Sequence, residues 1–113
     1  MEKQPTEAEI KEFWEWCGFK LKEVKFGMSG IVPQWLLQDY ADWELPKIDL
    51  NNLFKYAVPK LSYLFLDGFW NGNEGCFNYA ATIGAPEGEY KKHEYYKDPA
   101  LALFWAIWEV IHG

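Results

Sequence analysis

Few residues in this chain are of the types that hold metals. There are two histidines, His93 and His112, and two cysteines, Cys17 and Cys76, and none of the four pair at a short ligand spacing such as HxxxH or CxxC. Zinc sites are usually built from such pairs. His93 lies among charged neighbours, as on a solvated strand, and a helix dipole favours His112 at a helix C-terminus. We therefore expect no metal and no cofactor.

Nucleophilic and phosphate-loop chemistry are not indicated either. Ser29 and Ser62 have no histidine near them in the sequence, and no GxSxG motif occurs. The segment 27–30, Gly-Met-Ser-Gly, lacks the lysine and the following helix of a phosphate-binding loop. The glycine-rich segment 71–75 fits a hairpin turn instead.

One cluster of carboxylates could in principle act on a substrate. Asp39, Asp42 and Glu44 surround Tyr40 and Trp43, and paired carboxylates beside aromatic rings also occur in carbohydrate sites. With seventeen acidic residues in the chain, however, such clusters arise by chance. No recognisable acid, base and nucleophile set is present, so we expect a binding protein with no catalytic residues.

Aromatic residues are the outlying feature of the composition. They make up 19% of 113 residues, with seven Trp, seven Tyr and eight Phe, and a core of this size can bury only some of them. Rings can stack a base, lysines can meet phosphates and amides can form hydrogen bonds. The predicted ligand-binding residues are Tyr40, Trp43, Trp70, Asn71, Asn73, Tyr90, Lys91, Lys92 and His93.

The charge pattern limits the class of ligand. The formal net charge is −6, and all eleven basic residues are lysines. Nucleic-acid binders usually carry a basic stripe and rely on the arginine fork, so we expect no nucleic-acid partner. A small phosphorylated ligand stays open, because a pocket can hold it with lysines, backbone amides and stacking.

Three helices are predicted from caps and periodicity. Thr6 and Glu9 form a capping box, and apolar residues then follow at helical spacing up to Gly18. Asp49 caps a second helix, in which Leu50, Leu53, Phe54, Ala57 and Leu61 share one face. Asp98 and Pro99 open the third. Phe13, Trp14 and Phe54 are the expected core rings, whereas Trp16 points to the polar side of the first helix.

The third helix is unusually apolar, around an arc of roughly 220° where an ordinary surface helix shows roughly 100°. It is either buried on two sides or part of a subunit interface, and we favour a homo-oligomer contact. Its apolar run, 100–108, is shorter than the ~20 residues of a membrane span.

The remaining segments predict an antiparallel sheet. Residues 19–26 alternate as a strand. Residues 31–37 are interpreted as the return strand, although Pro33 favours an edge position or a loop there, and 38–47 is expected to be a loop. Residues 62–70 and 76–83 form the strongest hairpin signal, and 89–96 is a further strand. The prediction is one α+β domain spanning 1–113, a sandwich-like antiparallel sheet of three to five strands flanked by three helices.

Three segments resemble the phage ABA sandwich domain proteins. They are TEAEI at 6–10 followed by Phe13, Trp14 and Trp16, DLNNLF at 49–54, and DPALAL at 98–103. The resemblance implies a small bacteriophage protein with a sheet between helices, made in the cytoplasm of an infected bacterium. It supplies no catalytic residues.

Three functions follow as hypotheses. The first is an anti-defence protein that sequesters a small host signal, such as a cyclic or ADP-ribose-type nucleotide. The second is an interaction module that binds and inhibits a host protein through an exposed patch of Trp16, Trp35 and Trp43. A phage structural component is a third interpretation. The polar N-terminus predicts neither signal peptide nor anchor, and the cysteines are expected as reduced thiols, with one disulfide left open.

Overall fold

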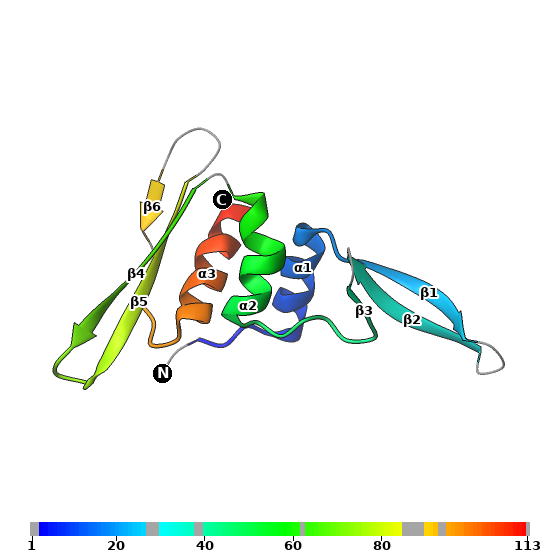
Figure 1. Ribbon diagram of the computed structural model, residues 1–113, viewed down its shortest axis with the longest axis horizontal. Coiled ribbons are helices and arrows are strands. Elements are labelled where there is room, and N and C mark those ends of the chain that lie inside the picture. The colour runs from blue at the N-terminus through cyan, green and yellow to red at the C-terminus, as the bar shows by residue number, and fades with distance from the viewer. Residues whose placement is uncertain are drawn as a thin grey trace. The chain divides into compact units, whose positions relative to one another are not determined.

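The computed structural model describes residues 3–26, 30–37, 40–61, 63–84, 90–92 and 95–112 (Figure 1). The α+β class is confirmed. The strands form two separate three-stranded antiparallel sheets, β1-β2-β3 and β4-β5-β6, rather than the one sheet that we expected. The chain divides into two compact units, Thr6–Lys47 and Ile48–Gly113 with Met1–Pro5. The single-domain organisation stays a prediction, and each unit is described by itself.

The unit Thr6–Lys47 opens with helix α1, Glu7–Cys17. Its capping box is confirmed, since the Thr6 amide donates to Glu9 Oε1 at 2.9 Å and the Glu9 amide donates to Thr6 Oγ1 at 3.2 Å. Gly18 ends the helix with a φ of 113°, a conformation that favours glycine. Phe13 and Trp14 are fully buried, as predicted.

The sheet of this unit consists of β1 (Lys20–Phe26), β2 (Gly30–Leu37) and β3 (Tyr40–Asp42). Strand β3 lies inside the segment that we expected to be a loop, because it continues the pairing of β2 from Trp35 to Leu37. Pro33 faces Glu23 of β1 in the part of β2 that β3 does not cover. That position suits a residue without an amide donor.

The second unit begins with a helix that changes its winding. Asp49 caps α2 (Leu50–Asn52), and the chain continues as the π-helix η2 (Leu53–Ala57) and the 3-10 helix η3 (Val58–Lys60). A π turn closes between residues five apart and so holds more residues than an α turn. It rotates Tyr56 into the core, where 5% of its surface is exposed, and leaves Phe54 47% exposed. The prediction of Phe54 as a core ring was therefore wrong.

The predicted hairpin is confirmed as β4 (Tyr63–Asn71) and β5 (Cys76–Gly84), and β6 (Tyr90–Lys92) pairs with the far side of β5. Gly75 closes the turn with a φ of 68°. Backbone hydrogen bonds between Tyr79 and Tyr96 extend this pairing.

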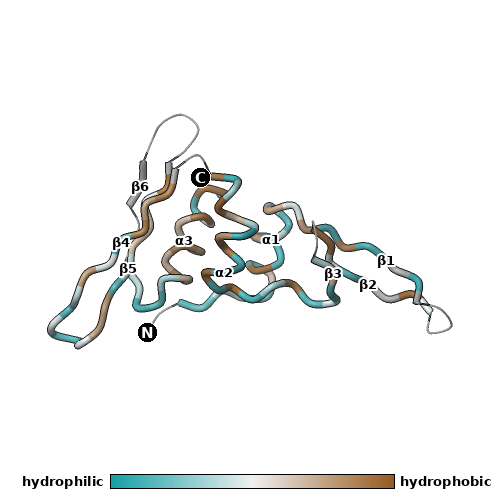
Figure 2. Tube along the Cα trace, in the orientation of Figure 1, coloured by the Kyte–Doolittle hydropathy of each residue, from teal (hydrophilic) through white to brown (hydrophobic). Residues whose placement is uncertain are grey.

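Helix α3, Pro99–His112, packs against β5 and the second helix. Residues 100–107 are all buried within the chain, and Figure 2 colours much of the helix as hydrophobic. The Trp105 indole donates to the Lys3 carbonyl at 3.0 Å. Apart from Pro99 at its start, the helix has side chains with appreciable exposure only from Trp108 onward. A homo-oligomer contact through this helix stays a prediction, and only that last part has surface for it.

The buried indole of Trp14 gives a stability prediction. Its Nε1–H donates to the Pro46 carbonyl at 2.9 Å, so Trp14→Phe removes the donor and leaves that carbonyl without it. We expect a loss of about 1–3 kcal/mol in the free energy of unfolding, measured by urea denaturation. Trp43→Phe is the control, because that indole is 72% exposed, and it should change stability by less than about 0.5 kcal/mol. Equal effects of both variants would contradict the assignment.

Candidate functional site

Exposed rings gather on the β4–β5 hairpin. Nine large apolar side chains are exposed in the described part of the chain, and five of them lie on this hairpin or beside it: Phe65, Phe69, Trp70, Phe77 and Tyr95. Residues directly opposite in an antiparallel pair point to the same face. The register therefore divides these five rings between two faces of one hairpin.

The first face, the helix-side face, is partly covered by α3. Leu66 lies opposite Ala81, which is fully buried, and Ile83 two residues further along is 2% exposed. Nearer the turn, Trp70 lies opposite Phe77, and their rings meet edge to face at 5.4 Å. These two side chains are 58% and 50% exposed. The helix-side face thus begins as core and ends as an exposed aromatic pair.

A glycine makes room for a third ring on the helix-side face. Tyr79 lies opposite Gly68, and a Cβ on Gly68 would stand 3.0 Å from two carbons of the Tyr79 ring. The ring of Tyr79 thus lies over the backbone of β4, 6.3 Å from that of Phe77. Three neighbouring rings on this face hold one another in place.

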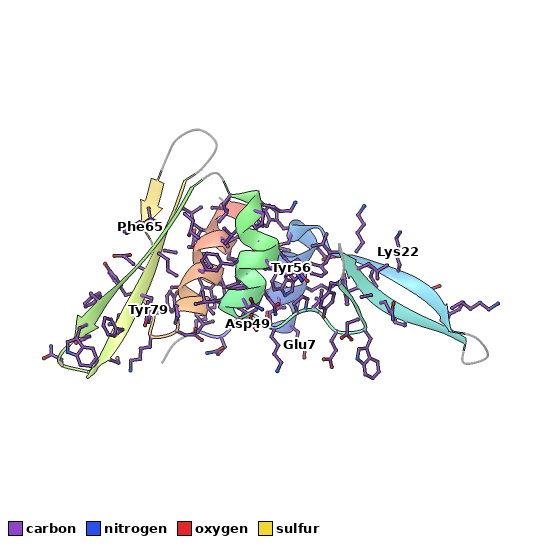
Figure 3. The ribbon with its side chains drawn as sticks, in the orientation of Figure 1. Glu7, Lys22, Asp49, Tyr56, Phe65 and Tyr79 are labelled. Atoms are coloured by element: carbon purple, nitrogen blue, oxygen red, sulfur yellow. The ribbon has the colours of Figure 1, made fainter. Side chains whose placement is uncertain are left out.

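The second face, the outer face, carries Phe65, Phe69 and Tyr95. Phe69 and Tyr95 meet edge to face at 4.7 Å, with their planes 88° apart. Ala80 lies between them in the register, opposite Asp67, and is fully buried. Figure 3 labels Phe65 of this face and Tyr79 of the helix-side face. On the outer face, the rings of Phe69 and Tyr95 consequently cover the small residue Ala80.

Polar contacts fix the turn between the strands. Asn71 Oδ1 accepts from the amides of Asn73 at 3.1 Å and Glu74 at 3.4 Å. The Gly75 amide donates to the Asn71 carbonyl at 2.8 Å. Glu74 forms an ion pair with Lys97 at 3.5 Å. The turn is therefore built from its own side chains, and the oxygen of Asn71 already serves it.

The residues predicted to bind a ligand are distributed over both units. Trp70, Asn71 and Asn73 come together at the end of the hairpin, whereas Tyr40 and Trp43 belong to the other unit. Tyr40 is half-buried, its hydroxyl donates to the Glu44 carbonyl, and its ring meets that of Phe19 at 5.3 Å. Both contacts of Tyr40 thus stabilise the segment that carries it.

Several predicted positions have no described side chain. Tyr90, Lys91 and Lys92 are placed by their backbone in β6, and their side chains lie outside the described residues. His93 lies outside the described residues altogether, as do Ser29, Asp39 and Ser62.

The alternative patch of three tryptophans is not formed as expected. Trp43 is 72% exposed, but Trp35 is only 8% exposed and Trp16 is half-buried. Trp35 lies in the middle strand, opposite Leu21 of β1 and Asp42 of β3.

Sequence reasoning missed Phe65, Phe69, Phe77 and Tyr95 as surface rings. The signal was present in β4, Tyr-Leu-Phe-Leu-Asp-Gly-Phe-Trp-Asn, where Leu64 and Leu66 alternate with Phe65. A period of two puts the leucines and that phenylalanine on opposite faces, so one set had to leave the core.

Comparisons with known proteins add no relative. No family model, no curated protein and no solved structure matches the chain. The resemblance to phage ABA sandwich proteins accordingly stays a prediction. Within the described residues, no group of three His, Cys, Asp or Glu side chains lies close enough to hold a metal ion, and no helix is long and apolar enough to span a bilayer. Cys17 and Cys76 are thiols, the first of them buried.

The packing of Tyr79 over Gly68 can be tested with two alanine variants. Gly68→Ala places a methyl group against the Tyr79 ring, whereas Gly72→Ala, in the turn, meets nothing within 4 Å. Overpacking costs about 1–3 kcal/mol, so we expect Gly68→Ala to be at least about 1 kcal/mol less stable than Gly72→Ala in urea denaturation. Equal stability of the two variants would show that the ring does not lie over this residue.

Proposed function

We propose that this protein binds and inhibits another protein through the aromatic rings of the β4–β5 hairpin. The partner is taken to be a bacterial host protein, in keeping with the resemblance of the sequence to phage proteins. One observation carries the proposal: five of the nine exposed large apolar side chains of the described residues belong to this one element and its neighbour Tyr95.

The composition of the hairpin supports recognition of a protein surface. Contiguous exposed apolar patches on soluble proteins mark interaction sites more often than chance. Tryptophan and tyrosine are enriched among the residues that contribute most to binding. Trp70 and Tyr95 belong to these types, and they lie beside Phe77 and Phe69 respectively.

The rings also lose little freedom when a partner binds. Edge-to-face contacts hold Trp70 against Phe77 and Phe69 against Tyr95, and the turn is fixed by the carboxamide of Asn71. Side chains that are already ordered cost less entropy on association than mobile ones. The hairpin thus presents a preorganised surface.

Capture of a nucleotide signal is the second candidate, favoured by the exposure of Trp70 next to Asn73 at the end of the hairpin. An exposed indole can stack on a base. The Asn71 oxygen is engaged within the turn, so hydrogen bonds to such a ligand would come from Asn73 or from backbone groups.

The protein-binding proposal predicts a ring-dependent affinity. Wild-type protein is used to isolate a partner from bacterial lysate, and the purified partner is then titrated by calorimetry. We expect Trp70→Ala/Phe77→Ala or Phe65→Ala/Phe69→Ala to weaken binding at least tenfold, about 1.4 kcal/mol. Trp43→Ala is the matched control, because that ring is the most exposed tryptophan of the other unit. The proposal is contradicted if neither hairpin variant changes the affinity for the partner, or if Trp43→Ala lowers that affinity equally.

The nucleotide candidate is tested separately by thermal shift with cyclic and ADP-ribose-type nucleotides. A ligand present at one hundred times its Kd stabilises the folded state by about 2.7 kcal/mol, so a true ligand gives a clear rise in Tm. The rise should disappear in Trp70→Ala and persist in Trp43→Ala. If no nucleotide of the panel shifts the Tm, this candidate is wrong.

A further inference from the structure

Within the described residues, each of the two sheets ends in a strand with no neighbour on its far side. Strand β1 is an outer strand of the sheet β1-β2-β3, and β4 is an outer strand of the sheet β4-β5-β6 (Figure 1). An outer strand presents backbone N–H and C=O groups on the side that faces no neighbour, and these groups can pair with a strand of another molecule.

The hydrogen bonds on the far side of β5 determine which way the backbone groups of β4 point. The amides and carbonyls of Tyr79 and Tyr96 bond one another at 2.6 and 2.7 Å, so the Tyr79 backbone points away from β4. Hydrogen-bonded and non-bonded pairs alternate along an antiparallel ladder. Gly68, opposite Tyr79, therefore directs its N–H and C=O to the open side of β4, and Leu66 and Trp70 do the same.

The charges of the two outer strands differ in sign. Strand β1 carries Lys20, Lys22 and Lys25 against one acid, Glu23, within a chain of net charge −6. Strand β4 has a single charged residue, Asp67, at its centre. Lysines on an outer strand discourage pairing with an identical strand, and two β4 strands paired about their centres would bring Asp67 against Asp67. Like charges directly opposite one another are destabilising.

The mixed pairing joins a strand of net positive charge to a strand whose one charged residue is acidic. We propose that β1 of one copy pairs antiparallel with β4 of a second copy, with Lys22 opposite Asp67. In this register Lys20 falls opposite Phe69 and Leu21 falls opposite Gly68. All seven residues of β1 then find a partner in β4. Lys22, labelled in Figure 3, is exposed, and Leu21 is 52% exposed, so the contact covers an apolar side chain.

Such a contact joins unlike surfaces, so every copy keeps one β1 and one β4 for further neighbours. Head-to-tail association of this kind grows with concentration. It is independent of the function proposed above, because assembly uses the open side of β4, whereas partner recognition uses the rings on the two faces of the hairpin. If the assembly proposal fails its test, the partner-binding proposal is unaffected, and the reverse also holds.

Two variants block the two sides of the contact. The β1 variant, Lys20→Glu/Lys22→Glu/Lys25→Glu, reverses the lysines, and Lys11→Glu/Lys47→Glu/Lys60→Glu is its control with the same net charge. Gly68→Pro removes the outward N–H of β4. Its control is Gly68→Ala, which adds the same Cβ beside Tyr79 but keeps the N–H. Circular dichroism reports whether each variant is folded.

Light scattering from about 10 µM to about 1 mM, a range in which weak contacts become populated, gives the result. We expect the wild type and both controls to gain mass with concentration, and each blocked variant to stay monomeric. A 1:1 mixture of the two blocked variants should stop at a dimer, since one supplies a native β4 and the other a native β1.

Three outcomes would overturn the proposal. The first is a wild type that stays monomeric over the whole range. The second is a mixture of the two blocked variants that forms no dimer although both are folded. The third is a charge-matched control that loses assembly as fully as the β1 variant. If Gly68→Pro does not fold, Asp67→Lys replaces it: alone it should stay monomeric, and mixed with the β1 variant it should assemble beyond a dimer, because the lysine introduced at position 67 then faces the glutamate introduced at position 22.

Discussion

The register between β4 and β5 decides what this protein presents to its surroundings. Because side chains alternate along a strand, a slip of one residue would exchange the two faces and bring Phe65 and Phe69 against α3. The register is fixed at both ends by different forces. At the turn, Asn71 accepts two amide hydrogen bonds, and at the other end Ala81 and Ile83 are buried where α3 packs against β5. The register thereby assigns each ring between these ends to one face of the hairpin.

The burial of α3 explains why the aromatic surplus appears on the hairpin. Eight successive residues of the helix, 100–107, are buried within the chain. The core of the chain therefore takes up most of the apolar surface of this helix. The β4–β5 hairpin, in contrast, extends beyond α3 towards its turn (Figure 1), and the exposed rings of Trp70 and Phe77 lie near that turn. Rings that pack on one another limit the apolar area left to water, as Trp70 and Phe77 do.

Local signals predicted much of the fold. The capping box of Thr6 and Glu9, the Asp49 cap and the glycine-rich turn at 71–75 all work within a few residues, and the structure has each of them. The errors arose where distant contacts decide. A π turn moved Phe54 out of the core, and pairing with β2 made a strand of Tyr40–Asp42. Single-residue propensities predict neither the π turn nor the pairing of Tyr40–Asp42 with β2.

The candidate site was predictable only in part for the same reason. Trp70, Asn71 and Asn73 were found because turn chemistry is local, whereas Phe69 and Tyr95 meet across a pairing that joins segments far apart in the sequence. Tyr40 illustrates the opposite error. It looked like a ligand-binding ring among carboxylates, but its hydroxyl and its ring are both used to hold its own segment.

The absence of arginine bears on how tightly these surfaces can hold a neighbour. Arginine on an outer strand would stack on the exposed rings and bind carboxylates with two parallel hydrogen bonds, whereas lysine acts as a flexible, strongly hydrated point charge. In a chain of net charge −6 with eleven lysines and no arginine, copies repel one another at long range, and the lysines of β1 form a local exception. Charges of this kind select which surfaces meet more than they strengthen the contact. An assembly built on them would be weak and reversible, and it would leave the aromatic faces of the hairpin exposed to a partner.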